Sequence, residues 1–201
     1  PDGVDLEVGG TVEDQGDAFG DLGTLLILIV ILVYIVMATQ FESLKFPFII
    51  MFTIPFAFTG VFVALWMTST PLSLIALIGA IMLVGIVTKN GIVMVDYMNL
   101  LVERGSGVFD AVIAGGKSRL RPVLMTSFTT ILGMLPLAIG TGAGSETWQP
   151  MGIAVIGGLT FSTILTLFIV PVLYSILVNR SQRKEREKLA RLSAEHQASK
   201  H

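Results

Sequence analysis

Five long apolar stretches, separated by shorter polar segments, set the pattern of this 201-residue chain. A helix needs about 20 mostly apolar residues to cross the hydrocarbon core of a bilayer, because lipid cannot satisfy free backbone N–H and C=O groups. The pattern predicts an all-α integral membrane protein, a bundle of five transmembrane helices, with no buried sheet beyond a possible short N-terminal strand. The predicted spans are approximately 22–39, 46–67, 72–98, 123–141 and 151–178.

Composition agrees with a membrane location for most of the chain. Hydrophobic residues make up 53% of it, charged residues only 14%, and the mean hydropathy is +0.79. These values exclude an ordinary soluble globular domain. The absence of cysteine excludes a disulfide framework and a cysteine-based metal site. The two histidines, His196 and His201, lie in a polar tail, so we expect no bound metal and no cofactor.

The charged residues are segregated along the chain, although the net charge is only -2. Residues 1–21 contain seven acids and no base, whereas residues 179–201 contain seven bases. Cytoplasmic segments of membrane proteins carry an excess of Lys and Arg. We therefore predict that the tail 179–201 and the connector 99–122 are cytoplasmic and that residues 1–21 lie outside. This orientation places 12 of the 13 bases inside, and the exception is Lys89 in the third span.

The polar ends carry two further expectations. The tail is expected to be either a solvated cytoplasmic helix or disordered. Its bases are not interleaved with aromatic residues, so topology and anionic lipid explain them and no nucleic-acid partner is expected. The first apolar stretch follows an acidic segment instead of a basic one, so we predict no signal peptide and expect the N-terminus to be the cut edge of a longer chain.

The connector is predicted to contain a short amphipathic helix around Val108–Gly115. Asp110 and Lys117 are expected to face water. Four apolar residues are expected to face the membrane surface: Val108, Phe109, Ala111 and Val112.

Lys89 is the strongest candidate for chemistry, because a charged side chain at membrane depth is costly and is by default a functional hypothesis. It precedes Met98 by nine residues, which places it about 14 Å from the inner end of its helix, near the middle of the bilayer. Asn90 is adjacent, and Asp96 is two turns away, about 10 Å and beyond salt-bridge reach. No acid in the chain lies at the right depth, so the partner of Lys89 must come from elsewhere. A relay role is favoured over a salt bridge that only locks helix packing.

Thr126, one turn into the fourth predicted span, is a second candidate. Its hydroxyl can join a polar network around Lys89. Taken alone, however, a threonine in a membrane helix more often bonds its own backbone. Both interpretations remain open for this residue.

Four motifs, in order and in register, resemble those of the resistance-nodulation-division (RND) efflux pumps. The resemblance covers essentially the whole chain and is nearer to the hydrophobe/amphiphile branch than to the heavy-metal exporters. Residues 1–21 resemble the end of the second periplasmic porter segment, and the membrane region 22–178 resembles transmembrane helices 8–12 of a twelve-helix domain. The motifs are Phe41-Glu42-Ser43 before Pro47, Thr88–Val93, Arg119–Ser127 and Thr141–Gly144.

The resemblance implies a secondary active transporter of the bacterial inner membrane and not an enzyme. Such a pump works as a homotrimer, exchanges protons for amphiphilic or toxic compounds, and acts with a periplasmic adaptor and an outer-membrane channel. Lys89 matches the family's relay lysine, Thr126 its relay threonine and Arg119 the arginine near the cytoplasmic mouth, with Asn90 and Asp96 as secondary candidates. The acid pair that they serve lies on the fourth helix of the N-terminal half, so this chain alone should not transport.

Two other functions stay open. One is an RND relative that moves metal ions, lipids or polypeptide. The porter domains would distinguish such a relative from a drug-efflux pump. The other is a structural membrane module without transport, in which Lys89 is dispensable. If the third and fourth spans pack with their polar positions inward, Lys89 and Thr126 should face one groove and Arg119 should lie at its cytoplasmic end.

Overall fold

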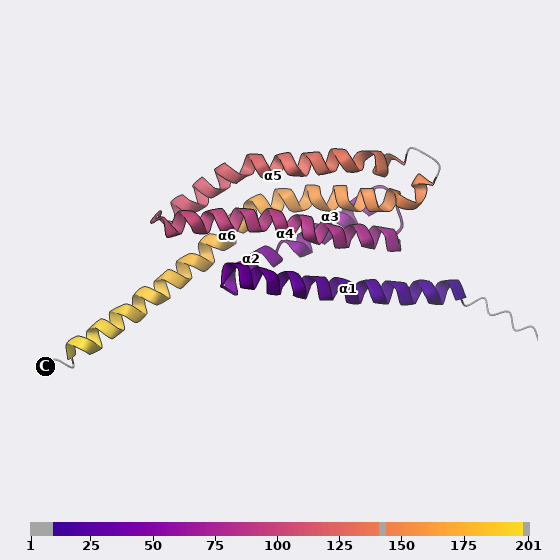
Figure 1. Cartoon of the computed structure of the whole chain (residues 1–201). Helices are drawn as coiled ribbons and strands as arrows, with labels where there is room; N and C mark the ends of the chain where they lie inside the picture. The colour runs from indigo at the N-terminus through magenta and orange to yellow at the C-terminus, as the bar shows by residue number, and fades with distance from the viewer. Residues whose placement is uncertain (1–9, 141–143, 199–201) are drawn as a thin grey trace, which may run out of the picture.

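The computed structural model describes residues 10–140 and 144–198, with side chains for 14–140 and 144–180, and this part contains helices and no strand. Five of its helical segments are long and apolar enough to cross a membrane, which confirms the predicted helix bundle. Helix begins at Gly10, and residues 1–9, where a possible short N-terminal strand would have to lie, are outside the described residues. The helices, labelled in Figure 1, are α1 (Gly10–Phe41), α2 (Lys45–Met51), α3 (Ile54–Met67), α4 (Leu74–Glu103), α5 (Val108–Ile139) and α6 (Ser145–Ala198).

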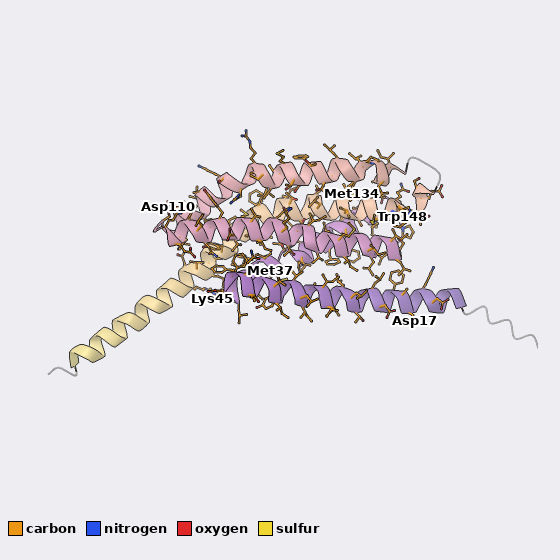
Figure 2. All side chains as sticks on the ribbon, in the orientation of Figure 1. Asp17, Met37, Lys45, Asp110, Met134 and Trp148 are labelled. Carbon is orange, nitrogen blue, oxygen red and sulfur yellow. The ribbon has the colours of Figure 1, made fainter. Side chains whose placement is uncertain are left out.

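The acidic segment before the first span belongs to the same helix as the span. Helix α1 begins at Gly10 and runs without a break to Phe41. Asp14, Asp17 and Asp21 therefore continue the axis of the first membrane helix. Figure 2 shows Asp17 at the same end of the bundle as Trp148, whereas Lys45 and Asp110 lie at the opposite end.

The second predicted span is interrupted near its start. Helices α2 and α3 are separated at Phe52 and Thr53. Pro55 lies in the first turn of α3 and has no N–H to donate to the preceding turn. The Thr53 hydroxyl instead donates to the carbonyl of Ile50 at 2.6 Å. The two helices together still cover the length of one span, Lys45–Met67.

The predicted connector helix forms, but it does not end at Gly115. It continues as the fourth span, so Val108–Ile139 is one helix with Pro122 inside it. The prediction about its faces is wrong for Val108 and Ala111, which are buried in the protein instead of facing the membrane surface. Phe109 is 71% exposed, which agrees with the prediction. Asp110 and Lys117 are exposed, as expected. The reason is close packing, because a Cβ on Gly115 would lie against the side chain of Met98 in α4.

Helix α6 lies at the centre of the packing and contacts α3, α4 and α5 extensively. Small residues make this possible. A Cβ on Gly157 would collide with Ala64 of α3, and a Cβ on Gly60 would lie 2.8 Å from the carbonyl of Gly157. The small residues Gly60 and Ala64, one turn apart on α3, thus form a helix–helix contact with α6, as is usual in membranes. Beyond the bundle α6 extends as a single projecting helix to Ala198 (Figure 1), so the tail is helical to that residue.

Candidate functional site

Helices α4 and α5 enclose a groove of about 340 Å³ at mid-length. Lys89 and Thr126 both line it, as the sequence predicts. The remaining lining residues are Ile86, Asn90, Met125, Ser127, Thr129 and Thr130. The groove therefore combines one amine, one amide and four hydroxyl side chains in a region that is otherwise apolar.

Some residues of the Thr88–Val93 motif line this groove, and others lie in contacts between α4 and neighbouring helices. Thr88 and Gly91 are buried, and a Cβ on Gly91 would lie 2.8 Å from Ile50 of α2. Lys89 is exposed at the surface of the chain and Asn90 is half-buried. The glycine fixes the distance between α4 and α2, while the next face of the helix presents the amine to the groove.

Lys89 makes no ion pair with any side chain in the part of the protein that the structure describes. It also lines a second hollow of about 340 Å³ between α1 and α4, whose other walls are mainly apolar. The Lys89 side chain is thus exposed to a hollow on each side of α4. A partner from outside this chain can reach it without rearrangement of the bundle.

Thr126 donates its hydroxyl to its own helix. The acceptors are the carbonyls of Pro122 at 3.1 Å and Val123 at 3.0 Å. The Thr126 hydroxyl proton is therefore bonded to its own backbone, as is usual for a threonine in a membrane helix. Its oxygen still has lone pairs that can accept a hydrogen bond from a group in the groove.

Arg119 does not line the groove. It precedes Thr126 by seven residues, about 10 Å along α5. Its guanidinium lies over the ring of Tyr97 in α4, 4.6 Å from the centroid. Among the described residues its Nε is buried without a hydrogen-bond partner. Stacking on an aromatic face is a favourable position for a guanidinium.

Of the two secondary candidates, only Asn90 reaches the groove. Asp96 is exposed and is not among the residues that line it. Its separation from Lys89 by two helical turns accounts for this. The structure thus brings together Lys89, Asn90 and Thr126, and keeps Arg119 and Asp96 apart from them.

The sequence prediction missed the hydroxyl row that follows Thr126. Ser127 is buried and hydrogen-bonds Thr163 of α6 at 2.9 Å. Thr129 and Thr130 donate to backbone carbonyls one turn earlier, at 2.8 and 2.9 Å. The signal was present in the sequence, because four of the five residues 126–130 carry hydroxyls within an apolar span.

Comparison with known proteins identifies the class to which this fold and groove belong. The model of the AcrB/AcrD/AcrF family matches residues 1–178. The chain therefore belongs to this family of RND efflux transporters, and it is part of a multi-pass membrane protein.

Three relatives show how wide that family is. The chain is 39% identical over 185 residues to the swarming motility protein SwrC of Bacillus subtilis, covering 92% of this chain and 18% of SwrC. It is 38% identical to the cobalt-zinc-cadmium resistance protein CzcA of Cupriavidus metallidurans, over 92% of this chain and 17% of CzcA. It is 42% identical to the multidrug resistance protein MdtC of Erwinia tasmaniensis, over 81% of this chain and 16% of MdtC.

A solved structure agrees with these relatives. The crystal structure of a heavy metal efflux pump matches with a TM-score of 0.76 and 32% identity, covering 85% of this chain and 17% of the pump. The chain thus spans less than a fifth of the relatives that it matches.

Proposed function

We propose that this chain is the C-terminal membrane half of a proton-motive-force-driven transporter that exports amphiphilic or toxic compounds. Lys89 and Thr126 act as relay groups, and Arg119 acts near the cytoplasmic mouth. The observation that carries the proposal is the groove between α4 and α5, where an amine without an acid partner in the described residues meets Asn90 and a row of hydroxyls.

An acid from the rest of the transporter completes this site. A lone ammonium group in a membrane is costly, and the usual compensation is a carboxylate. The N-terminal membrane half supplies it from an acidic pair on its fourth helix. Protonation of that pair releases Lys89, and the change in charge at the groove couples proton flow to movement of the helices.

The proposed topology follows the charges. Residues 1–21 are the end of the periplasmic porter region, 22–178 are the transmembrane domain, and 179–201 are a basic cytoplasmic tail. The N-terminal edge is periplasmic and the C-terminus cytoplasmic, in the inner membrane, because this orientation leaves no base in the outer segments. The partners are the N-terminal half, the porter domains, two further copies in a homotrimer, the lipid bilayer, and a periplasmic adaptor with an outer-membrane channel.

The test is export by the full-length transporter that contains this chain. We expect Lys89→Ala to abolish proton-driven export while expression and assembly stay normal, since it removes a charge and little core volume. Lys89→Arg should also fail, because a guanidinium does not release its proton at working pH. Lys117→Ala is the matched control, since Lys117 is an exposed base outside the groove. Normal export by both Lys89 variants would refute the relay role.

Export of metal ions is the second candidate function. The similarity to CzcA and to the heavy metal efflux pump favours it, because these matches are as extensive as the match to MdtC. Cells that carry the full-length transporter distinguish the two. Tolerance of cationic detergents and dyes supports amphiphile export, whereas tolerance of cobalt, zinc or cadmium alone supports metal export.

A further inference from the structure

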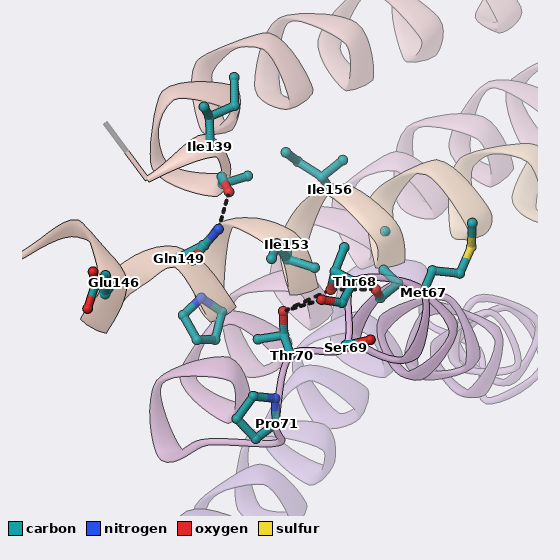
Figure 3. Close-up of a pocket in the computed structure, with 14 residues that line it drawn as sticks. Met67, Thr68, Ser69, Thr70, Pro71, Ile139, Glu146, Gln149, Ile153 and Ile156 are labelled. Carbon is teal, nitrogen blue, oxygen red and sulfur yellow. Dashed lines mark hydrogen bonds between the residues drawn. The ribbon is translucent and has the colours of Figure 1, made fainter. Parts of the chain in front are cut away.

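A hollow of about 720 Å³ opens at the opposite end of the bundle from Lys45 and Asp110. It lies between the end of α3, the turn 68–71, the end of α5 and the start of α6. Figure 3 shows its side chains approaching from these segments, with Met67, Ile139, Ile153 and Ile156 as apolar walls. Pockets for drug-sized ligands span roughly 300–1,000 Å³, so the hollow has room for an organic molecule.

The two tryptophans of the chain place this hollow at a membrane surface. Trp66 lies at the end of α3 and is 82% exposed, and Trp148 lies in the first turn of α6 and is 50% exposed. Tryptophan is enriched where the hydrocarbon core meets water. An alkyl chain can therefore enter the hollow from lipid while a polar group stays in contact with water.

One charged group of the hollow has no protein partner among the described residues. The hydroxyls of Thr68 and Thr70 bond each other at 2.9 Å, and Gln149 donates through Nε2 to the carbonyl of Ala138 at 3.0 Å. Glu146 also lines the hollow, is exposed, and has no ion pair or hydrogen bond within the described residues. The segments 68–73 and 140–150 contain no Lys or Arg. The local charge is therefore negative and favours a cationic ligand.

We propose that this hollow binds an amphiphile with an ammonium head group. The alkyl part lies against Met67, Ile139 and Ile153, and the ammonium group pairs with the Glu146 carboxylate. The same chemistry is presented by a membrane aminolipid and by a free cationic amphiphile. This site rests on the geometry of the hollow and is separate from the relay groove.

Photolabelling of the full-length transporter tests the site. The protein is purified in dodecyl maltoside and exposed to a photoactivatable dodecylammonium probe or to the same probe with a neutral hydroxyl head. We expect label from both probes within residues 64–71, 138–139 and 146–157. Glu146→Gln should reduce labelling by the cationic probe about fivefold, which corresponds to the loss of an exposed ion pair. Labelling by the neutral probe should stay unchanged. Glu103→Gln, an exposed acid at the other end of the bundle, is the matched control.

A second variant tests the apolar walls. Ile156→Trp fills space in the hollow and should reduce labelling by both probes. Competition identifies the source of the ligand: displacement by phosphatidylethanolamine assigns an aminolipid, and displacement only by unlabelled dodecylammonium assigns a free amphiphile. Label confined to other segments would overturn the proposal, and so would an equal loss of labelling by both probes in Glu146→Gln. The assay needs no proton gradient, so its outcome is independent of the role of Lys89.

Discussion

The first and last membrane helices are both apolar, yet they occupy opposite environments. Only 6% of the apolar window of α1 is buried inside the chain, against 50% for α6. Helix α1 touches α2 and α4 near Met37 and exposes Leu25, Leu28 and Ile31. Helix α6 lies among three neighbours. The difference shows that hydrophobicity is enough for a helix to lie in the membrane. Small residues, which let helix backbones approach closely, determine whether the helix packs at the centre of the bundle.

The largest expected effect tests those small residues. Gly157→Leu places a side chain where Ala64 and the carbonyl of Gly60 already lie. We expect it to destabilise the full-length transporter by about 3 kcal/mol, since overpacking forces the backbone apart. Thermal unfolding in detergent measures this. Gly23→Leu in α1 is the control, because a Cβ there meets nothing within 4 Å. An equal loss in Gly23→Leu would show that α1 is packed by another part of the transporter.

A leucine pair tests the same comparison by removal of volume. Leu159 of α6 is fully buried, whereas Leu28 of α1 is 49% exposed. Leu159→Ala should cost about 2 kcal/mol, because the cavity loses packing contacts. Leu28→Ala should cost less than about 0.5 kcal/mol, as usual for exposed positions. Unfolding in mixed micelles with increasing denaturing detergent gives both values, and similar losses would contradict the contrast between the helices.

The smallest effect concerns the buried hydroxyl pair. Ser127→Ala removes the hydrogen bond to Thr163 and should cost about 0.6 kcal/mol, the average for such bonds in a membrane protein. A double-mutant cycle with Thr163→Val isolates the coupling. Thr129→Ala is the control, since that hydroxyl bonds only its own backbone. A coupling energy near zero would show that α5 and α6 are held together without this bond.

Much of the candidate site was predictable from particular residues. Lys89 and Thr126 were expected to share a groove, and they do, because polar residues in a membrane helix turn toward other polar residues. The position of Arg119 on Tyr97 was not predictable, since residues on different helices meet only after packing. The continuous helix α5 was also missed: the polar connector sequence suggested a separate element, but burial of Val108 and Ala111 against the bundle keeps it helical.

The sequence by itself determined the number of membrane helices, because backbone groups in lipid must be satisfied within each span. It also determined the family, since the model of the AcrB/AcrD/AcrF family matches residues 1–178. Only the tertiary structure decided which apolar faces are buried, that Ser127 pairs with Thr163, and that Glu146 lies beside an apolar hollow. Lipid tails are as apolar as leucine side chains. The sequence therefore gives the same signal for an apolar residue that faces lipid and for one that faces protein. Only the contacts between helices distinguish these two positions.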